Sequence, residues 1–150
     1  MSSVACGRFK ECLDKCSWIG PLLARITVGV VFAQAGWGKL HNLAQVTSFF
    51  AELGIPAAGI QAPFVSTLEF VGGLMVLFGF LTRWISIPLA FTMVVAIVTA
   101  KRGDIHGIGD LLGLSEFAYF AIFTWLVFAG AGKISVDCWC ERRCKAKQAP

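Results

Sequence analysis

Four long apolar stretches, separated by short polar or glycine-rich breaks, dominate the pattern of hydrophobic and polar positions along the chain. A helix needs about 17–25 mainly apolar residues to cross the hydrocarbon core of a bilayer. The first two stretches have that length by themselves, whereas the last two reach it only with flanking residues. The pattern therefore predicts four membrane-spanning helices, at residues 18–37, 63–81, 84–100 and 117–131.

A shorter amphipathic pattern lies between the first two predicted spans, within residues 42–62. Its apolar residues recur at positions i, i+3, i+4 and i+7, which form one face of a helix. They are Val46, Phe49, Phe50 and Leu53. The sequence Gly54-Ile55-Pro56 then ends the helical pattern. We therefore expect a short helix that lies at the membrane interface rather than across the membrane.

The composition agrees with a membrane protein and argues against a soluble one. Hydrophobic residues make up 57% of the 150-residue chain, charged residues only 15%, and the mean hydropathy is +0.73. A chain of this length has room for one domain. We therefore predict an all-α fold, a polytopic membrane four-helix bundle. The polar first residues do not resemble a cleavable signal, so we expect the first span to stay as an anchor.

Basic residues indicate which side of the membrane each loop faces. With four spans, both termini and the turn at residues 82–83 lie on one side. That side carries nine Lys or Arg residues, against Lys39, Lys101 and Arg102 on the other. Because such charges collect on the cytoplasmic side, both termini are predicted to be cytoplasmic (N-in, C-in), in a bacterial-type inner membrane. The net charge of +4 is concentrated on that side, which favours membrane lipids with anionic headgroups as partners. We expect no nucleic acid partner.

Two ionisable residues, Arg25 and Glu69, lie inside the first and second predicted spans. A charge at membrane depth costs about 3 kcal/mol or more, so it normally faces the bundle interior and finds a partner. At about 100° per residue, Gly29 and Gly36 share a helical face with Arg25, and Gly73 shares one with Glu69. Since small residues let helices approach closely, we expect the two charged faces to pack together.

The partner of Glu69 has two candidates. At about 1.5 Å per residue, Arg25 is expected about 8 Å nearer to the cytoplasmic edge than Glu69, a gap that an extended arginine side chain would bridge. Lys39, at the outer end of the first span, is the rival. Such a pair would fix the register of two helices, unless Arg25 reaches the headgroups instead. The functional alternatives are a polar pocket for a small amphiphile and a carboxylate that handles a proton.

Several short motifs, taken in their order, resemble the DoxX family over about residues 18–137. They are Arg25 early in the first span, Gly-x-Gly-Lys-Leu at 36–40, Phe-Phe…Gly-Ile-Pro within 49–56, Glu-x-x-Gly-Gly…Gly-x-x-Thr-Arg at 69–83 and Gly-x-Gly-x-x-Ser-x-Asp at 130–137. The resemblance implies a four-helix inner-membrane protein. The relatives that this resemblance implies include the DoxD and DoxX subunits tied to thiosulfate:quinone oxidoreduction, and MauE-like proteins tied to disulfide chemistry. It also implies that any shared site is carried by Arg25, Lys39, Glu69 and Arg83.

The predicted topology divides the chain into a cytoplasmic amphipathic arm at 1–17, a membrane domain at 18–137 and a basic cytoplasmic tail at 138–150. The six cysteines lie only in the arm and the tail, a departure from the usual DoxX pattern: Cys6, Cys12, Cys16, Cys138, Cys140 and Cys144. Cys12/Cys16 and Cys140/Cys144 have i, i+4 spacing, which places both thiols on one helical face. Reduced thiols of this kind bind zinc, Cu(I) or an iron–sulfur cluster, or cycle as redox thiols. Buried or lipidated cysteines are the alternatives, and an inverted topology would favour disulfides.

The residues support two functional hypotheses. The first is a small integral-membrane accessory subunit of a respiratory or redox complex. It would dock against larger membrane subunits and shape a quinone or lipid pocket around Arg25 and Glu69, as a non-catalytic subunit rather than a self-contained enzyme. The alternative is a thiol-redox or metal-handling membrane protein that acts through its terminal cysteines. No nucleophile–base pair, phosphate-binding glycine loop or dinucleotide motif in the sequence supports soluble-type catalysis.

Overall fold

The computed structural model describes residues 17–132, 135–139 and 143, and these residues form helices and connecting turns with no strand. The elements are α2 (Ile19–His41), α3 (Leu43–Glu52), α4 (Ala58–Phe78), α5 (Thr82–Thr99), the 3-10 turn η1 (Arg102–Asp104), α6 (Ile108–Gly113) and α7 (Ser115–Ala129). The all-α prediction is confirmed for this part of the chain. The predicted arm at 1–17 lies almost wholly outside the described residues, as does most of the tail at 138–150.

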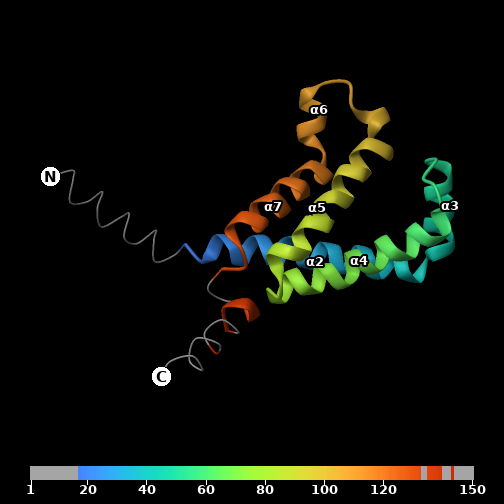
Figure 1. The fold of residues 1–150 in the computed structure, drawn as a ribbon. Helices are drawn as coiled ribbons and strands as arrows, with labels where there is room; N and C mark the ends of the chain where they lie inside the picture. Colours follow the sequence, from blue (N-terminus) through green and yellow to red (C-terminus); the bar gives the residue numbers. More distant parts are fainter. Residues whose placement is uncertain (1–16, 133–134, 140–142, 144–150) are drawn as a thin grey trace.

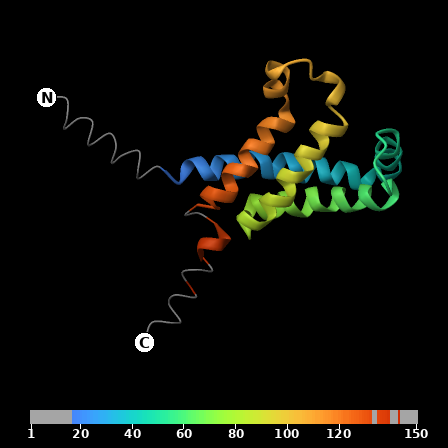
Figure 2. The ribbon, with the colours of Figure 1, turned by 45° about the horizontal axis from the view of Figure 1, so that its top comes forward.

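The long helices form two antiparallel pairs, α2 with α4 and α5 with α7, and the second pair is inclined across the first (Figure 1; Figure 2). We call the end of the bundle that holds the start of α2, the α4–α5 turn and the end of α7 the terminal end. The opposite end, which holds α3, η1 and α6, is the loop end. Because the pairs are inclined, α5 diverges from α4 towards the loop end (Figure 1).

Among the helices that the structure describes, three are long and apolar enough to cross a membrane: α2, α4 and α5. The helix α7 is apolar but has only 15 residues. At about 1.5 Å per residue it measures about 22 Å, short of the roughly 30 Å hydrocarbon core. The structure thus supports a multi-pass membrane protein with three spanning helices. The fourth span and the cytoplasmic position of the termini stay predictions.

The pairing of α2 with α4 depends on glycines at the contact. A Cβ atom added to Gly73 would lie 2.5 Å from the backbone nitrogen of Ala33, and one added to Gly29 would lie 2.8 Å from the Cβ of Leu77. Gly36 meets the backbone of Phe70 in the same way. No side chain fits between the helices at these points, so their backbones approach closely. The predicted packing of the two charged, glycine-lined faces is confirmed.

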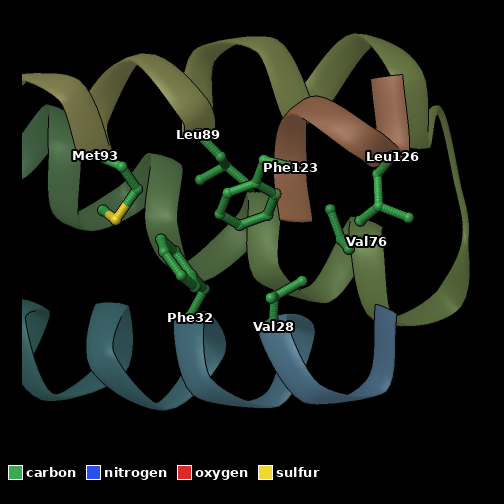
Figure 3. Close-up of a cluster of buried hydrophobic side chains, with 7 residues drawn as sticks. All are labelled: Val28, Phe32, Val76, Leu89, Met93, Phe123 and Leu126. Carbon is green, nitrogen blue, oxygen red and sulfur yellow. The ribbon is translucent and has the colours of Figure 1, made fainter. Parts of the chain in front are cut away.

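A cluster of seven buried apolar side chains joins the two helix pairs (Figure 3). Its members come from all four long helices: Val28, Phe32, Val76, Leu89, Met93, Phe123 and Leu126. At its centre, the ring of Phe32 meets that of Phe123 edge to face, with centroids 4.8 Å apart. Aromatic pairs in this geometry contribute about 1 kcal/mol beyond the apolar area they bury. This cluster holds α7 against α2 and closes the middle of the bundle.

Candidate functional site

Arg25 lies at the terminal end and binds the backbone of two other segments. Its Nε donates to the carbonyl oxygen of Val76 at 2.9 Å, and its Nη2 to that of Leu77 at 2.9 Å. Its Nη1 donates to the carbonyl oxygen of Ala131 at 2.7 Å. Carbonyls in the last turn of a helix lack the usual amide partner four residues on. The guanidinium supplies a donor to Leu77 and a second donor to Val76, whose carbonyl also accepts from the N–H of Gly79 at 3.1 Å. With 2% of its surface exposed, Arg25 joins α2, the end of α4 and the segment after α7.

Asp137 adds a second tie at the same end. Its backbone N–H donates to the carbonyl oxygen of Gly79 at 3.1 Å. Its carboxylate oxygens accept from the backbone N–H groups of Leu81 at 2.8 Å and Thr82 at 3.2 Å. A carboxylate at a helix N-terminus satisfies amides that lack a partner and complements the helix dipole. We call Arg25, Asp137 and the backbone groups they bind the terminal-end cluster.

Glu69 lies farther along α4 and pairs with Lys39 of α2, not with Arg25. The Nζ of Lys39 donates to the Oε2 of Glu69 at 2.6 Å. Glu69 is only 3% exposed, whereas 36% of the Lys39 side chain is exposed. The Oε1 of Glu69 accepts no hydrogen bond from any residue that the structure describes. Of the two candidate partners that the sequence offered, the fold therefore selects Lys39.

The Lys39–Glu69 pair forms part of the wall of a cavity of about 1000 Å³ at the loop end. We call this cavity, which lies between α3, α4 and α5, the loop-end pocket. Its walls are largely aromatic and aliphatic, and include Phe49, Phe50, Leu68 and Val95. Arg25 is not among the lining residues and borders a separate hollow on the outer surface beside Trp139. The pocket thus joins a large, mainly apolar volume to an ion pair whose carboxylate is buried.

Two exposed phenylalanines mark the opening of this pocket. Phe64 of α4 and Phe91 of α5 both line the pocket, yet they are 66% and 67% exposed. Both belong to helices long and apolar enough to span a membrane. Side chains that line a cavity and are also largely exposed stand at its opening. The pocket therefore opens on the outer surface of the bundle, beside two candidate spanning helices.

The DoxX family profile matches residues 20–102, which is more than half of the chain. The chain belongs to the DoxX family. The matched segment runs from α2 to α5, and it contains Lys39, Glu69 and most of the pocket wall. It ends before α7, so the family match itself covers three of the four long helices.

Three relatives resemble this DoxX protein along most of its length. The inner membrane protein YqjF of Escherichia coli is 34% identical over 126 residues, which cover 83% of this chain and 95% of YqjF. CatD of Bacillus subtilis, provisionally named an oxidoreductase, is 30% identical over 120 residues, 80% of this chain and 84% of CatD. The membrane protein Rv3486 of Mycobacterium tuberculosis is 32% identical over 133 residues, 81% of this chain and 82% of Rv3486. No solved structure matches the chain significantly.

The remaining predicted site residues of this DoxX protein are only partly described. Arg83 is exposed at the terminal end, where its Nε would lie 2.8 Å from a Cβ atom added to Gly130. Cys138 is a half-buried free thiol beside Asp137. The other predicted metal or redox thiols lie outside the described residues: Cys6, Cys12, Cys16, Cys140 and Cys144. Within residues 17–132, 135–139 and 143, no three His, Cys, Asp or Glu residues gather closely enough to hold a metal ion.

Sequence reasoning missed the capping role of Asp137 and most of the pocket wall. The Gly-x-Gly-x-x-Ser-x-Asp motif was the available signal for Asp137, because a carboxylate a few residues past a helix end often satisfies nearby amides. The pocket wall had no comparable signal. The apolar residues of α5 that line it have the same composition as residues that face lipid.

Proposed function

We propose that this DoxX protein is an accessory subunit of a membrane redox system and binds a quinone-type amphiphile in the loop-end pocket. The observation that carries the proposal is the ion pair between Lys39 and the buried Glu69 on the wall of a mainly apolar cavity of about 1000 Å³. Small-molecule sites commonly combine a volume of about 300–1000 Å³, apolar walls and a few polar groups that orient the ligand.

The polar groups suit the head of such a ligand. An ammonium group has three hydrogens, and Lys39 uses one of them on Glu69. A second hydrogen on Nζ is suited to a ligand carbonyl oxygen. The aromatic side chains nearby, Phe49 and Phe50, offer flat surfaces for a ring. The head would thus be held by one charge-assisted hydrogen bond and by ring contacts.

The mouth suits the tail. An isoprenoid or alkyl chain would leave the pocket between Phe64 and Phe91 and continue into the bilayer. Water-filled entry is not needed, because the ligand is already dissolved in the hydrocarbon. This arrangement favours a membrane-borne amphiphile over a soluble metabolite.

The accessory role rests on similarity and on the size of the chain. CatD, 30% identical over 120 residues, carries a provisional oxidoreductase name. YqjF, 34% identical over 126 residues, is an inner membrane protein. A chain of 150 residues is small, and the loop-end pocket would hold the amphiphile but leaves little room for a redox cofactor as well. We propose that a larger partner in the same membrane exchanges electrons with it.

Binding is tested by blocking the pocket while leaving the ion pair intact. Ala96 lines the pocket, and Ala96→Trp would fill it. Ala35 is exposed on α2 and is not among the lining residues, so Ala35→Trp is the matched control. Equilibrium binding of a decyl-chain quinone is measured with each protein in nanodiscs. We expect Ala96→Trp to weaken binding at least about tenfold, because the bulky ring occupies ligand space, and Ala35→Trp to leave it unchanged.

Two outcomes would contradict the binding proposal. One is a wild-type protein that does not bind the quinone, and the other is an Ala96→Trp protein that folds and binds as tightly as the wild type. Melting curves of both variants in detergent show whether the fold is intact. The accessory role is tested separately, by purifying the tagged chain from its native membrane in a mild detergent. A stoichiometric redox enzyme is the expected companion, and a chain that runs alone at its own mass would argue against this role.

A further inference from the structure

We infer that the loop-end pocket binds the reduced, hydroxyl-bearing form of its amphiphile more tightly than the oxidised, carbonyl form. This inference rests on the proposed function and adds to it the redox state of the ligand. It comes from one atom, the Oε1 of Glu69.

Glu69 has one carboxylate oxygen occupied and one available. Its Oε2 accepts a hydrogen bond from the Nζ of Lys39 at 2.6 Å. Its Oε1 accepts none from the residues that the structure describes, although Glu69 is 97% buried. This oxygen is not among the fully buried side-chain atoms that lack a partner within the described residues, which are the hydroxyls of Thr82 and Ser86, so it keeps some accessible surface. The residue lines the pocket, so a ligand donor is placed to meet this oxygen.

A hydroxyl group suits this arrangement and a carbonyl group does not. A phenolic hydroxyl donates its hydrogen to Oε1 and accepts one from Lys39 Nζ, so it makes two hydrogen bonds. A carbonyl oxygen can only accept, so it makes the bond to Lys39 alone. It also brings its own lone pairs close to those of the carboxylate. The mainly apolar walls strengthen both effects, because hydrogen bonds and charge repulsion are stronger where the local dielectric constant is low.

The difference has a measurable size. A hydrogen bond to a charged acceptor in a protein contributes enough to change a dissociation constant about tenfold or more. We therefore expect the wild-type protein in nanodiscs to bind a decyl-chain hydroquinone about tenfold more tightly than the matching quinone. The hydroquinone is kept reduced under anaerobic conditions, and both dissociation constants are measured by equilibrium dialysis.

Glu69→Gln is the decisive variant. An amide has nearly the shape of a carboxylate, and its N–H₂ group donates to a carbonyl oxygen. We expect the tenfold preference to disappear or reverse in Glu69→Gln. The matched control is Glu52→Gln, because Glu52 is exposed on α3 and is not among the residues that line the pocket. Its hydroquinone preference should equal that of the wild type.

The outcomes separate this inference from the proposal beneath it. A wild-type protein that binds both forms equally, or prefers the quinone, overturns the inference and leaves the quinone site standing. Binding of neither form overturns both. A folded Glu69→Gln protein that keeps the full preference overturns the assignment to Glu69. A monoacylglycerol with a decanoyl chain supplies hydroxyl donors without a ring, and if it binds as tightly as the hydroquinone, the site recognises hydroxyl lipids rather than the quinone couple.

Discussion

The α2–α4 pair buries two charges, Arg25 at the terminal end and Glu69 on the side of the loop-end pocket, and it satisfies them in opposite ways. At the terminal end, Arg25 donates to three backbone carbonyls on two other segments, at 2.7–2.9 Å. At the loop end, Glu69 accepts one side-chain hydrogen bond, from Lys39, and its second oxygen meets no donor among the described residues. The guanidinium of Arg25 therefore stabilises the fold through its hydrogen bonds to the backbone. The carboxylate of Glu69 retains capacity to bind something else.

The chemistry of the two groups explains much of this contrast. A guanidinium has five hydrogens in a fixed plane and accepts nothing. The end of a helix offers several carbonyls that lack a partner, and its dipole favours a positive charge there. A carboxylate in the middle of α4 has no comparable set of free amides, because helix amides in that region already bond within the helix. It depends on side chains, and only Lys39 among the described residues reaches it.

The largest expected effect is the loss of the terminal-end cluster. Arg25→Met leaves the carbonyls of Leu77 and Ala131 without this donor, while the carbonyl of Val76 keeps its hydrogen bond from the N–H of Gly79. Each buried unsatisfied group, and the lost hydrogen bond to Val76, costs about 1 kcal/mol or more. We expect the free energy of unfolding in detergent to fall by about 3 kcal/mol. Arg83→Met, which removes an exposed arginine at the same end, should cost less than about 1 kcal/mol. Equal losses in the two variants would show that the Arg25 hydrogen bonds do not hold the bundle.

A smaller effect is expected at the same end from Asp137→Ala. The variant removes the acceptor of the Leu81 and Thr82 amides, and losing such a cap costs about 1–2 kcal/mol. The local sign should be faster hydrogen exchange in the first turn of α5. Ligand binding at the loop end should not change, because the cap lies at the other end of the bundle. Weaker binding of the quinone to this variant would contradict the view that the two ends of the bundle act independently.

The loop-end pair should matter more for binding than for stability. Glu69→Leu leaves Lys39 without its partner, but the 36% exposed lysine side chain lies near the end of its helix and can reach water. We expect a loss of about 1 kcal/mol in unfolding free energy. The double variant Lys39→Met/Glu69→Leu should be within about 1 kcal/mol of the wild type, since apolar replacements of buried pairs are often neutral. Both variants should lose the hydroquinone preference measured in nanodiscs.

The smallest effect is expected from the cysteines. No cysteine is among the described residues that line the loop-end pocket. Replacing all six with serine should therefore leave the dissociation constants of the decyl-chain quinone and hydroquinone unchanged within error. If the variant still binds both ligands but the activity of its redox partner is lost, the function would depend on the terminal thiols. That result would favour the thiol or metal hypothesis over the pocket.

Much of the fold could be predicted from particular residues. The apolar stretches predicted α2, α4 and α5, and the i, i+4 pattern around Phe49 and Phe50 predicted the short helix α3. Gly29, Gly36 and Gly73 predicted the face at which α2 meets α4. These features depend on hydrophobicity and residue size at known helical spacing, which are local properties of a chain.

By itself, the sequence determined that this DoxX protein buries one basic and one acidic residue on glycine-lined faces of adjacent membrane helices. The tertiary structure alone decided what each charge binds. The helix α4 ends at Phe78, which leaves the carbonyls of Val76 and Leu77 at the depth of Arg25. The second helix pair is inclined across the first, α5 diverges from α4 towards the loop end, and the pocket beside Glu69 lies there. Gly79, with φ +73°, is a local signal for the end of α4, but the partners of the α4 carbonyls and the angle between the helix pairs arise from contacts between distant segments.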